Sequence, residues 1–287
     1  MLQLKPPLTI DEQIELLRSR GLIIDHVDAA KTVLANVNYY RLINAYSLGL
    51  YKLDEPETYK DDVHFLNIYD LYRFDSKLRH IISLPLEQFE IQFKTRLAYY
   101  LATKYCATCY LRKELFINEN YYDKMIQKIE SERIQQDSSP VVKHHNEAYD
   151  GVLPIWVLVE ILSFGTVSKM YANLNKNDQD EIAKIYHVKS YILRSWLRAF
   201  VEVRNICAHY GRLYNKTLVS RPILFNDISS HVNNLRVFSV LILLVKHTSD
   251  SRLVDNIRLD LQNAFLLHPC VDPFKIGAPD NWETFLH

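Results

Sequence analysis

The chain has 287 residues, 48% of them hydrophobic, which is enough to bury a large core as one domain or as two packed ones. Its 34 basic residues balance 34 acidic residues, which excludes a whole-molecule field that would draw the chain onto nucleic acid or membrane. Any RNA contact must therefore come from a local patch. Six glycines and ten prolines exclude low-complexity segments and favour a compact, mostly helical protein.

Cysteine use and hydropathy indicate a cytoplasmic protein. Four cysteines in a chain of this size give no disulfide framework, and the N-terminus lacks the charged start and apolar core of a signal peptide. The longest apolar run, 237–245, has about half the length that a bilayer requires. We therefore expect no membrane partner.

The first 60 residues predict three short helices. Thr9 and Glu12 have the form of a capping box before a helix over 10–20, which Gly21 ends. Asp25 is suited to cap a second helix through residue 35, and residues 39–48 predict a third. We expect residues 1–60 to form a small N-terminal helical lobe.

The middle of the chain predicts longer helices. Apolar residues recur at spacings of three and four over 64–105, with Pro85 between two series, which predicts two long helices or one kinked helix. A more polar helix is expected over 119–136, followed by a loop at 137–140. Pro154 suits the first position of a helix that extends through residue 171, where Gly165 indicates close approach of another helix.

The last third predicts a helix from about Ser190 to Tyr210, in which Trp196, Ala199 and Val203 begin an apolar stripe and Gly211 supplies a left-handed cap. Two further helices, over 228–248 and 252–266, precede an irregular tail at 269–287. No stretch shows the alternation of a strand. We predict an all-α protein, with a multi-helix core over 61–268 between the lobe and the tail.

The most informative residues lie at the end of the 190–210 helix. Arg204, Asn205 and His209 fall within one and a half turns. A guanidinium holds phosphate through paired hydrogen bonds, and an imidazole transfers protons near neutral pH. These residue types suit RNA cleavage without a metal, in which a 2′-hydroxyl attacks the adjacent phosphorus and His209 moves the proton. Arg204 stabilises the charge on the phosphate, and Asn205 orients either the histidine or the phosphate. At a helix end the dipole favours a protonated imidazole, and hence the acid role.

The spacing itself is weak evidence, because Arg20/His26 and Arg73/His80 show similar spacings in the same chain. Moreover, five residues on an ideal helix rotate by about 140°, so Arg204 and His209 do not share a face, whereas Asn205 and His209 do. The arginine must reach around, the helix must bend near Gly211, or a second copy must face the first across a two-fold axis. The last possibility predicts a homodimer.

Arg204-Asn205-Ile206-Cys207-Ala208-His209 resembles the Arg-Asn-x-x-x-His signature of HEPN ribonucleases, with the shortest of their four to six intervening residues. The wider chain resembles the bacterial Abi-D/Abi-F (Abi-2) abortive-infection family. The stretches that carry this resemblance are 38–42 with Tyr46, 74–79, 154–156 with Glu160, 164–165 with Tyr171, 204–214 and 277–282.

This resemblance implies a HEPN-like helical bundle, a toxin-like endoribonuclease in phage defence and, for some relatives, control by a structured antitoxin RNA. It implies Arg204, Asn205 and His209 as catalytic residues and no metal or other cofactor. HEPN folds also include inactive members, so the alternative is a catalytically silent module that binds RNA or protein. A purely structural scaffold is disfavoured because it leaves the polar triad without a purpose.

Other residues are candidates with more ordinary explanations. Glu160 is either a buried partner of a basic residue or a support to the site. Cys106, Cys109, His144 and His145 have ligand types for zinc, but a second cysteine pair is missing. Lys124, Lys128 and Arg133 recur along one helix and either track phosphates or form a solvated face. The candidate RNA-binding residues are Tyr40, Arg41, Arg73, His80, Tyr210 and Arg212.

Overall fold

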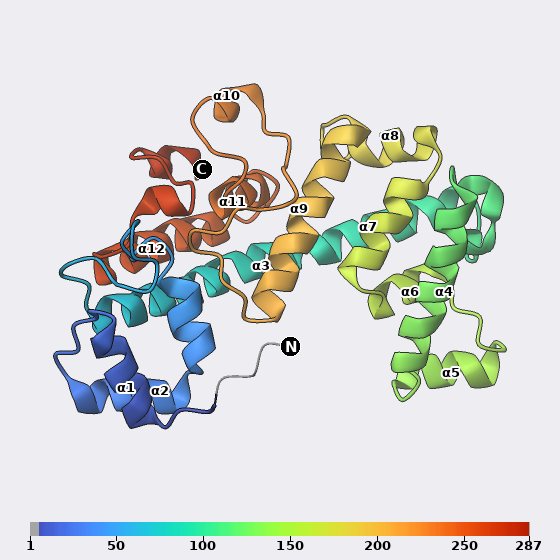
Figure 1. The fold of residues 1–287 in the computed structure, drawn as a ribbon. Coiled ribbons are helices and arrows are strands. Elements are labelled where there is room, and N and C mark those ends of the chain that lie inside the picture. Colours follow the sequence, from blue (N-terminus) through green and yellow to red (C-terminus); the bar gives the residue numbers. More distant parts are fainter. Residues whose placement is uncertain (1–5, 287) are drawn as a thin grey trace. The chain divides into compact units, whose positions relative to one another are not determined.

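The computed structural model describes residues 6–286, which form helices joined by turns and loops (Figure 1). Within these residues there is no β-strand, and extended pairing is limited to isolated bridges such as that between Phe116 and Leu174. The predicted all-α class is therefore confirmed. The chain divides into two compact units. Unit 1 comprises residues up to His80 and Leu259–Pro273, and unit 2 comprises Ile81–Arg258 and the residues from Phe274.

Unit 1 begins with α1 (Ile10–Ser19) and α2 (Val27–Asn36). The predicted capping box is present, since the Glu12 N–H donates to the Thr9 hydroxyl at 3.3 Å and the Thr9 N–H donates to the Glu12 carboxylate at 2.7 Å. Asp25 does not cap α2, because its carboxylate bonds to the His64 ring at 2.6 Å, and His26 takes the N-cap position. The predicted third helix is a short π-helical turn, η1 (Tyr40–Asn44).

A buried carboxylate ties unit 1 together. Asp75 of α3 (Phe65–Lys104) is fully buried and accepts hydrogen bonds from the Tyr46 hydroxyl and the Arg79 guanidinium, both at 2.6 Å. The C-terminal residues of α12 (Ser251–Leu267) belong to the same unit, where Phe265 stacks on Phe74 with ring centroids 5.5 Å apart. Burial of a paired carboxylate beside stacked aromatic rings makes this a specific core.

The long helix α3 decides between the two alternatives at Pro85, because it runs through that proline as one element of 40 residues. Its residues from 81 onward belong to unit 2, where α9 (Ser190–Ala208) packs on them through Phe200 and Phe89, with ring centroids 4.8 Å apart. The boundary between the two compact units thus falls inside α3 near residue 80. The division into domains near residue 60 stays a prediction.

Unit 2 is built around α9. It contacts α7 (Phe164–Asn173), α8 (Lys176–Lys184) and α11 (Val237–Val245), and α7 in turn contacts α4 (Glu119–Gln135). All residues of α11 are buried, as expected for its apolar run. Among the described residues, no helix combines the length and hydropathy that a membrane span requires.

The helix predicted from Pro154 through residue 171 is in fact two helices, α6 (Ile155–Ile161) and α7, separated at Ser163. The Ser163 side chain caps α7, and its N–H and hydroxyl both donate to the buried carboxylate of Glu132, at 2.8 and 2.9 Å. These bonds stabilise a break that the apolar spacing does not reveal. Pro154 is the N-cap of α6, one position before its predicted place.

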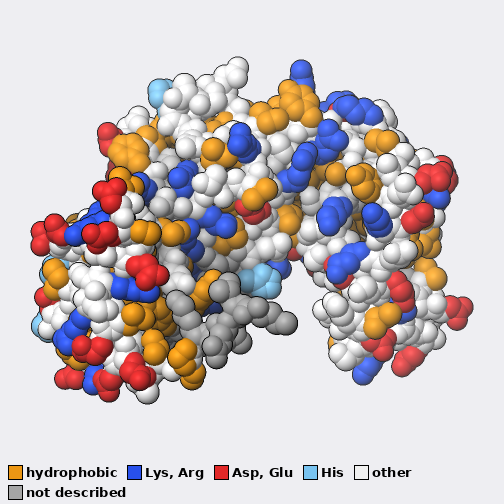
Figure 2. Space-filling model, viewed as in Figure 1, with side chains coloured by type: hydrophobic (Ala, Val, Ile, Leu, Met, Phe, Trp, Pro, Cys, Tyr) orange, Lys and Arg blue, Asp and Glu red, His pale blue; other side chains and the backbone are white. Residues whose placement is uncertain are grey.

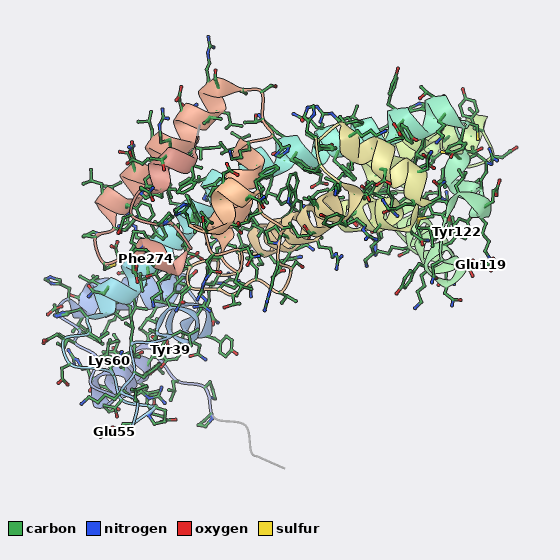
Figure 3. The ribbon with its side chains drawn as sticks, turned by 90° about the horizontal axis from the view of Figure 1, so that it is seen from above. Tyr39, Glu55, Lys60, Glu119, Tyr122 and Phe274 are labelled. Atoms are coloured by element: carbon green, nitrogen blue, oxygen red, sulfur yellow. The ribbon has the colours of Figure 1, made fainter. Side chains whose placement is uncertain are left out.

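Several short elements were not predicted, or begin elsewhere than predicted. The helix expected from residue 228 begins at Val237, and the tail after Pro273 packs Ile276 and Leu286 into unit 2. Tyr122 of α4, labelled in Figure 3, belongs to unit 2. Its ring packs on that of Phe116, with centroids 5.1 Å apart. The remaining elements are α5 (Pro140–Ala148), α10 (Asn226–Ser229), and the 3₁₀ turns η2 (Cys109–Leu111), η3 (Lys113–Leu115), η4 (Pro273–Lys275) and η5 (Trp282–Phe285).

Asp178 joins α8 to the end of α3. Its buried carboxylate accepts hydrogen bonds from the Tyr100 and Tyr105 hydroxyls at 2.9 Å, from Lys104 at 2.5 Å and from the Asn175 side chain at 2.7 Å. Burial by itself raises the pKa of Asp178. The hydrogen bonds, led by that from Lys104, outweigh burial and lower the pKa below its ordinary value of 3.8.

We predict that Asp178→Asn lowers the free energy of unfolding by roughly 2–3 kcal/mol, because it removes the charge that four donors surround. The folded-state pKa is lowered, so the contribution is complete above 3.8 and is lost as the pH falls through the folded-state value. Urea unfolding should give the same difference from the parent at pH 7 and pH 5. A difference that grows on acidification would contradict this.

Candidate functional site

Helix α9 ends one residue before the histidine of the motif. His209 is the C-cap, Tyr210 has a left-handed backbone with φ +55°, and the Gly211 N–H bonds to the Ile206 carbonyl at 2.7 Å. With the bond from the Tyr210 N–H to Cys207 at 3.1 Å, this is a Schellman cap. The left-handed residue is thus Tyr210 and not, as predicted, Gly211.

Position 211 favours glycine because there is little room there for a side chain. A Cβ atom at this position lies 3.1 Å from Ile206 Cγ2 and 3.3 Å from the Ile206 carbonyl oxygen, closer than ordinary contacts. The chain therefore turns tightly over the last turn of α9. This turn fixes the backbone on which His209 stands.

Arg204 is held by a carboxylate of α3. Its Nε lies 3.3 Å from Glu90 Oε2, and the same carboxylate is 2.8 Å from the ammonium of Lys94. Glu90 is largely buried, whereas the Arg204 side chain is 42% exposed. Because the hydrogen bond uses Nε, the two terminal amino groups of the guanidinium take no part in it. An oriented guanidinium of this kind suits a two-pronged contact with phosphate.

Asn205 and His209 lie on another side of α9. Both are exposed, and the His209 N–H donates to the Asn205 carbonyl at 3.0 Å, one turn apart. The structure therefore places Asn205 and His209 on one exposed face, while Arg204 reaches toward α3. This arrangement follows from the rotation of about 140° over five helical residues.

The segment after the motif returns along α9. The Glu202 carboxylate accepts the backbone N–H groups of Val219 at 2.9 Å and Ser220 at 2.7 Å, and the Trp196 indole donates to the Ile223 carbonyl at 2.6 Å. The charge of Glu202 thus holds the backbone of the returning segment. The returning segment keeps the helix end in one conformation.

The other predicted RNA-binding residues divide between the two units. Tyr40, which is 75% exposed, and the exposed Arg41 lie on η1 of unit 1. Arg73 and His80 also belong to unit 1, in its part of α3. Tyr210, 70% exposed, and the half-buried Arg212 follow the motif directly in unit 2. The sequence therefore places this last pair beside His209.

Glu160 is exposed on α6, so the alternative in which it is a buried partner of a basic residue is wrong, whereas its support to the site stays a prediction. The carboxylate that contacts Arg204 is that of Glu90, which sequence reasoning missed. One signal was present, since Glu90 and Lys94 are four residues apart and form a helical ion pair.

The cysteine and histidine residues considered for zinc do not form a metal site in the described part of the chain, where no cluster of three or more suitable ligands occurs. Cys109 is buried, and burial raises the pKa of its thiol to about 11. Such a thiol is a poor ligand at neutral pH.

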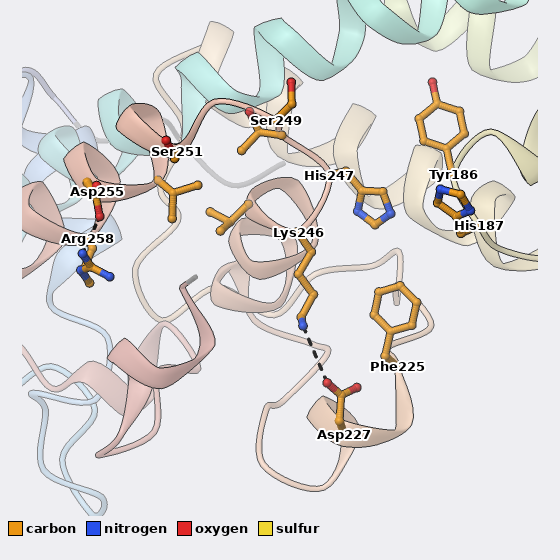
Figure 4. A pocket seen from close by; sticks show the side chains of 13 residues that line it. Tyr186, His187, Phe225, Asp227, Lys246, His247, Ser249, Ser251, Asp255 and Arg258 are labelled. Carbon is orange, nitrogen blue, oxygen red and sulfur yellow. Dashed lines mark hydrogen bonds and ion pairs between the residues drawn. The ribbon is translucent and has the colours of Figure 1, made fainter.

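A cavity of about 770 Å³ lies elsewhere in unit 2 (Figure 4). Lys246 in its wall pairs with Asp227 at 3.7 Å, and Arg258 pairs with Asp255 at 2.5 Å. Burial lowers the pKa of His247, whose ring bonds to the Leu243 carbonyl at 2.7 Å. The cavity thus neutralises its own cations, and no residue of the motif lines it.

Comparison with known families agrees with the resemblance seen in the sequence. The profile of the family described as Abi-like protein matches residues 32–215. The chain belongs to the Abi-like family. The match contains α9, Glu90 and the whole Arg204–His209 motif. No curated protein and no solved structure matches the chain.

Two glycine substitutions in this Abi-like chain test the description of the helix end. Gly211→Ala should destabilise the protein by about 1 kcal/mol, because the new methyl group meets Ile206. Gly165→Ala is the control. Gly165 lies within α7, and a Cβ atom there is at an ordinary 3.6 Å from Val201 of α9, so this substitution should be neutral or stabilising by up to about 1 kcal/mol. Thermal unfolding of both variants measures this, and equal effects would contradict it.

Proposed function

We propose that this Abi-like protein is a metal-independent endoribonuclease of abortive-infection phage defence. The observation that carries the proposal is the end of α9, where the His209 imidazole and the Asn205 amide are exposed on one face and Glu90 orients the Arg204 guanidinium on another. Family membership supports the biological setting. The rigid cap and the returning segment support a preorganised site.

The RNA supplies its own nucleophile in this mechanism. His209 either removes the proton of the 2′-hydroxyl, with water protonating the leaving 5′-oxygen, or protonates that oxygen while water takes the 2′-hydroxyl proton. The phosphorus–oxygen bond to the 5′-oxygen breaks as the 2′-oxygen attacks. Arg204 stabilises charge on the non-bridging oxygens, and Asn205 orients the phosphate. The products are a 2′,3′-cyclic phosphate and a 5′-hydroxyl. This scheme requires no cofactor.

We propose that the complete site contains two chains. Within one chain Arg204 is directed to α3 and His209 to the exposed face. A two-fold axis near the end of α9 would bring the arginine of one protomer toward the histidine of its partner, because such an axis places the same surface of both chains together. The exposed Tyr210 beside the motif supplies apolar surface for this contact.

The alternative is a catalytically silent module that binds RNA or protein, including a structured antitoxin RNA. The engagement of Arg204 with Glu90 favours it, because a guanidinium already paired with a carboxylate contributes less to a phosphate. Activity with defined variants separates the two functions.

The decisive experiment incubates purified protein with total RNA in EDTA, beside Arg204→Ala and His209→Ala. The parent should cleave, and each variant should lose at least about a hundredfold in rate, since each removes a group that acts in the transition state. Expression of the same variants in growing cells should remove any toxicity in parallel. Cleavage that survives both substitutions, or none by the parent, would reject the enzyme in favour of the binding module.

Glu90→Gln tests how Arg204 is positioned. The amide keeps the shape but loses the charge that orients the guanidinium, so cleavage should fall by about tenfold, less than in Arg204→Ala. The control is Glu87→Gln, one turn earlier on α3 and exposed. If Glu90→Gln cleaves faster than the parent, Glu90 restrains Arg204 instead of positioning it.

Mixing two inactive variants tests the composite site. Arg204→Ala and His209→Ala, refolded or co-expressed together, form heterodimers in which one of two sites has both groups. About a quarter of the parent activity should return, since half of the dimers are mixed and each has one intact site. No recovery, or only monomer in light scattering at micromolar concentration, would contradict the two-chain site.

A further inference from the structure

A basic groove of about 580 Å³ lies among α4, α7 and α9 of unit 2, on a face where Figure 2 shows Lys and Arg side chains gathered. Five cations line it: Lys124 and Lys128 from α4, Lys169 from α7, and Arg194 and Arg198 from α9. No acidic residue is part of the lining. In a chain whose formal charge is zero, this local excess is a feature of the fold.

The cations of the groove are largely uncompensated. Lys128 lies 3.4 Å from Glu132, a buried carboxylate that also accepts the Ser163 and Thr166 hydroxyls. Among the residues that the structure describes, Lys124, Lys169, Arg194 and Arg198 take part in no ion pair. The Nε of Arg194 is buried without an acceptor, although buried donors are nearly always bonded. Four of the five cations in the lining thus have no carboxylate partner among the described residues.

The rim of the groove carries an aromatic ring. Tyr121, in the first turn of α4, is 63% exposed and lines the same depression as the lysines. A basic track with an exposed ring at its edge is the pattern by which proteins bind single-stranded nucleic acid, through phosphates and base stacking together. An acidic protein segment would use the charges but not the ring.

Two groove residues and two motif residues, Asn205 and His209, lie along one stripe of α9. Arg194 and Arg198 are one turn apart. Asn205 and His209 follow Arg198 by seven and eleven residues, and these spacings place both within about 20° of Arg198 around the helix axis. The rise of α9 separates Arg198 from His209 by about 16 Å, or about five nucleotides at the ~3.4 Å rise of a stacked strand. Glu202 lies between them, with its charge directed to the Val219 and Ser220 N–H groups.

We propose that this groove binds the phosphate backbone of single-stranded RNA and leads the strand along α9 toward His209. Lys124, Lys169, Arg194 and Arg198 contact phosphates, and Tyr121 stacks on a base. The direction toward His209 rests on the proposed nuclease function, whereas the binding itself does not. The uncharged polar side chains Thr166 and Asn173 of the lining are already bonded to Glu132 and Asn118, so charge and stacking set the binding.

The test uses the full chain with His209→Ala, which prevents cleavage, and a fluorescent mixed-sequence RNA of twenty nucleotides. Lys169→Glu with Arg198→Glu reverses two groove charges. Lys143→Glu with Lys275→Glu reverses two exposed charges outside it and gives the same net charge. Fluorescence anisotropy over a salt series gives the dissociation constant and its salt dependence. Circular dichroism checks that each variant is folded.

The Lys169→Glu/Arg198→Glu variant should bind RNA at least tenfold more weakly than the control variant. Its slope of log affinity against log salt should be less negative by about 1.4, which is 0.7 for each lost phosphate contact. Tyr121→Ala should weaken binding further without changing the slope. Equal loss in both charge pairs, no RNA binding by the His209→Ala chain, or preference for polyglutamate over RNA would overturn the proposal. If the groove binds RNA but the parent protein never cleaves it, only the proposed nuclease function is rejected. If the parent cleaves RNA but binding does not depend on the groove residues, only the proposed groove is rejected.

Discussion

The rotation of α9 about its own axis is the constraint on which the rest of the candidate site depends. Trp196, Ala199, Phe200 and Val203 are fully buried, and Phe200 packs edge-on against Phe89 of α3. Turning the helix would expose these side chains at a cost of about 1.5–3 kcal/mol for each large one. With that face fixed, Arg204 must approach α3, and Asn205 and His209 must face outward. The core therefore determines the directions of the polar residues.

Local sequence signals predicted what local physics decides. The capping box of α1 and the apolar spacing of α3 each depend on residues within a few turns, and both were correct. The break at Ser163 was missed because its partner, Glu132, lies 31 residues away. Glu90 was missed for the same reason, being 114 residues from Arg204. Gly211 was assigned the left-handed conformation by residue preference, but steric crowding against Ile206 decides its role and leaves that conformation to Tyr210.

The basic groove shows the same limit. Lys124 and Lys128 recur along α4 in a way that fits either a solvated face or a phosphate track, and Arg133, predicted with them, pairs with Glu130 at 2.7 Å. What distinguishes the first two is that α7 and α9 add Lys169, Arg194 and Arg198 around them. Convergence of three helices is a property of the fold, and a neutral net charge conceals it.

The central claim is that RNA provides the nucleophile at an imidazole on the end of α9. It is tested most directly by giving the parent protein, in EDTA, two strands of one sequence, one RNA and one with every 2′-hydroxyl methylated. The account predicts cleavage of the RNA to 2′,3′-cyclic phosphate and 5′-hydroxyl ends and none of the methylated strand, because the attacking oxygen is blocked. Cleavage of the methylated strand at a similar rate would contradict it.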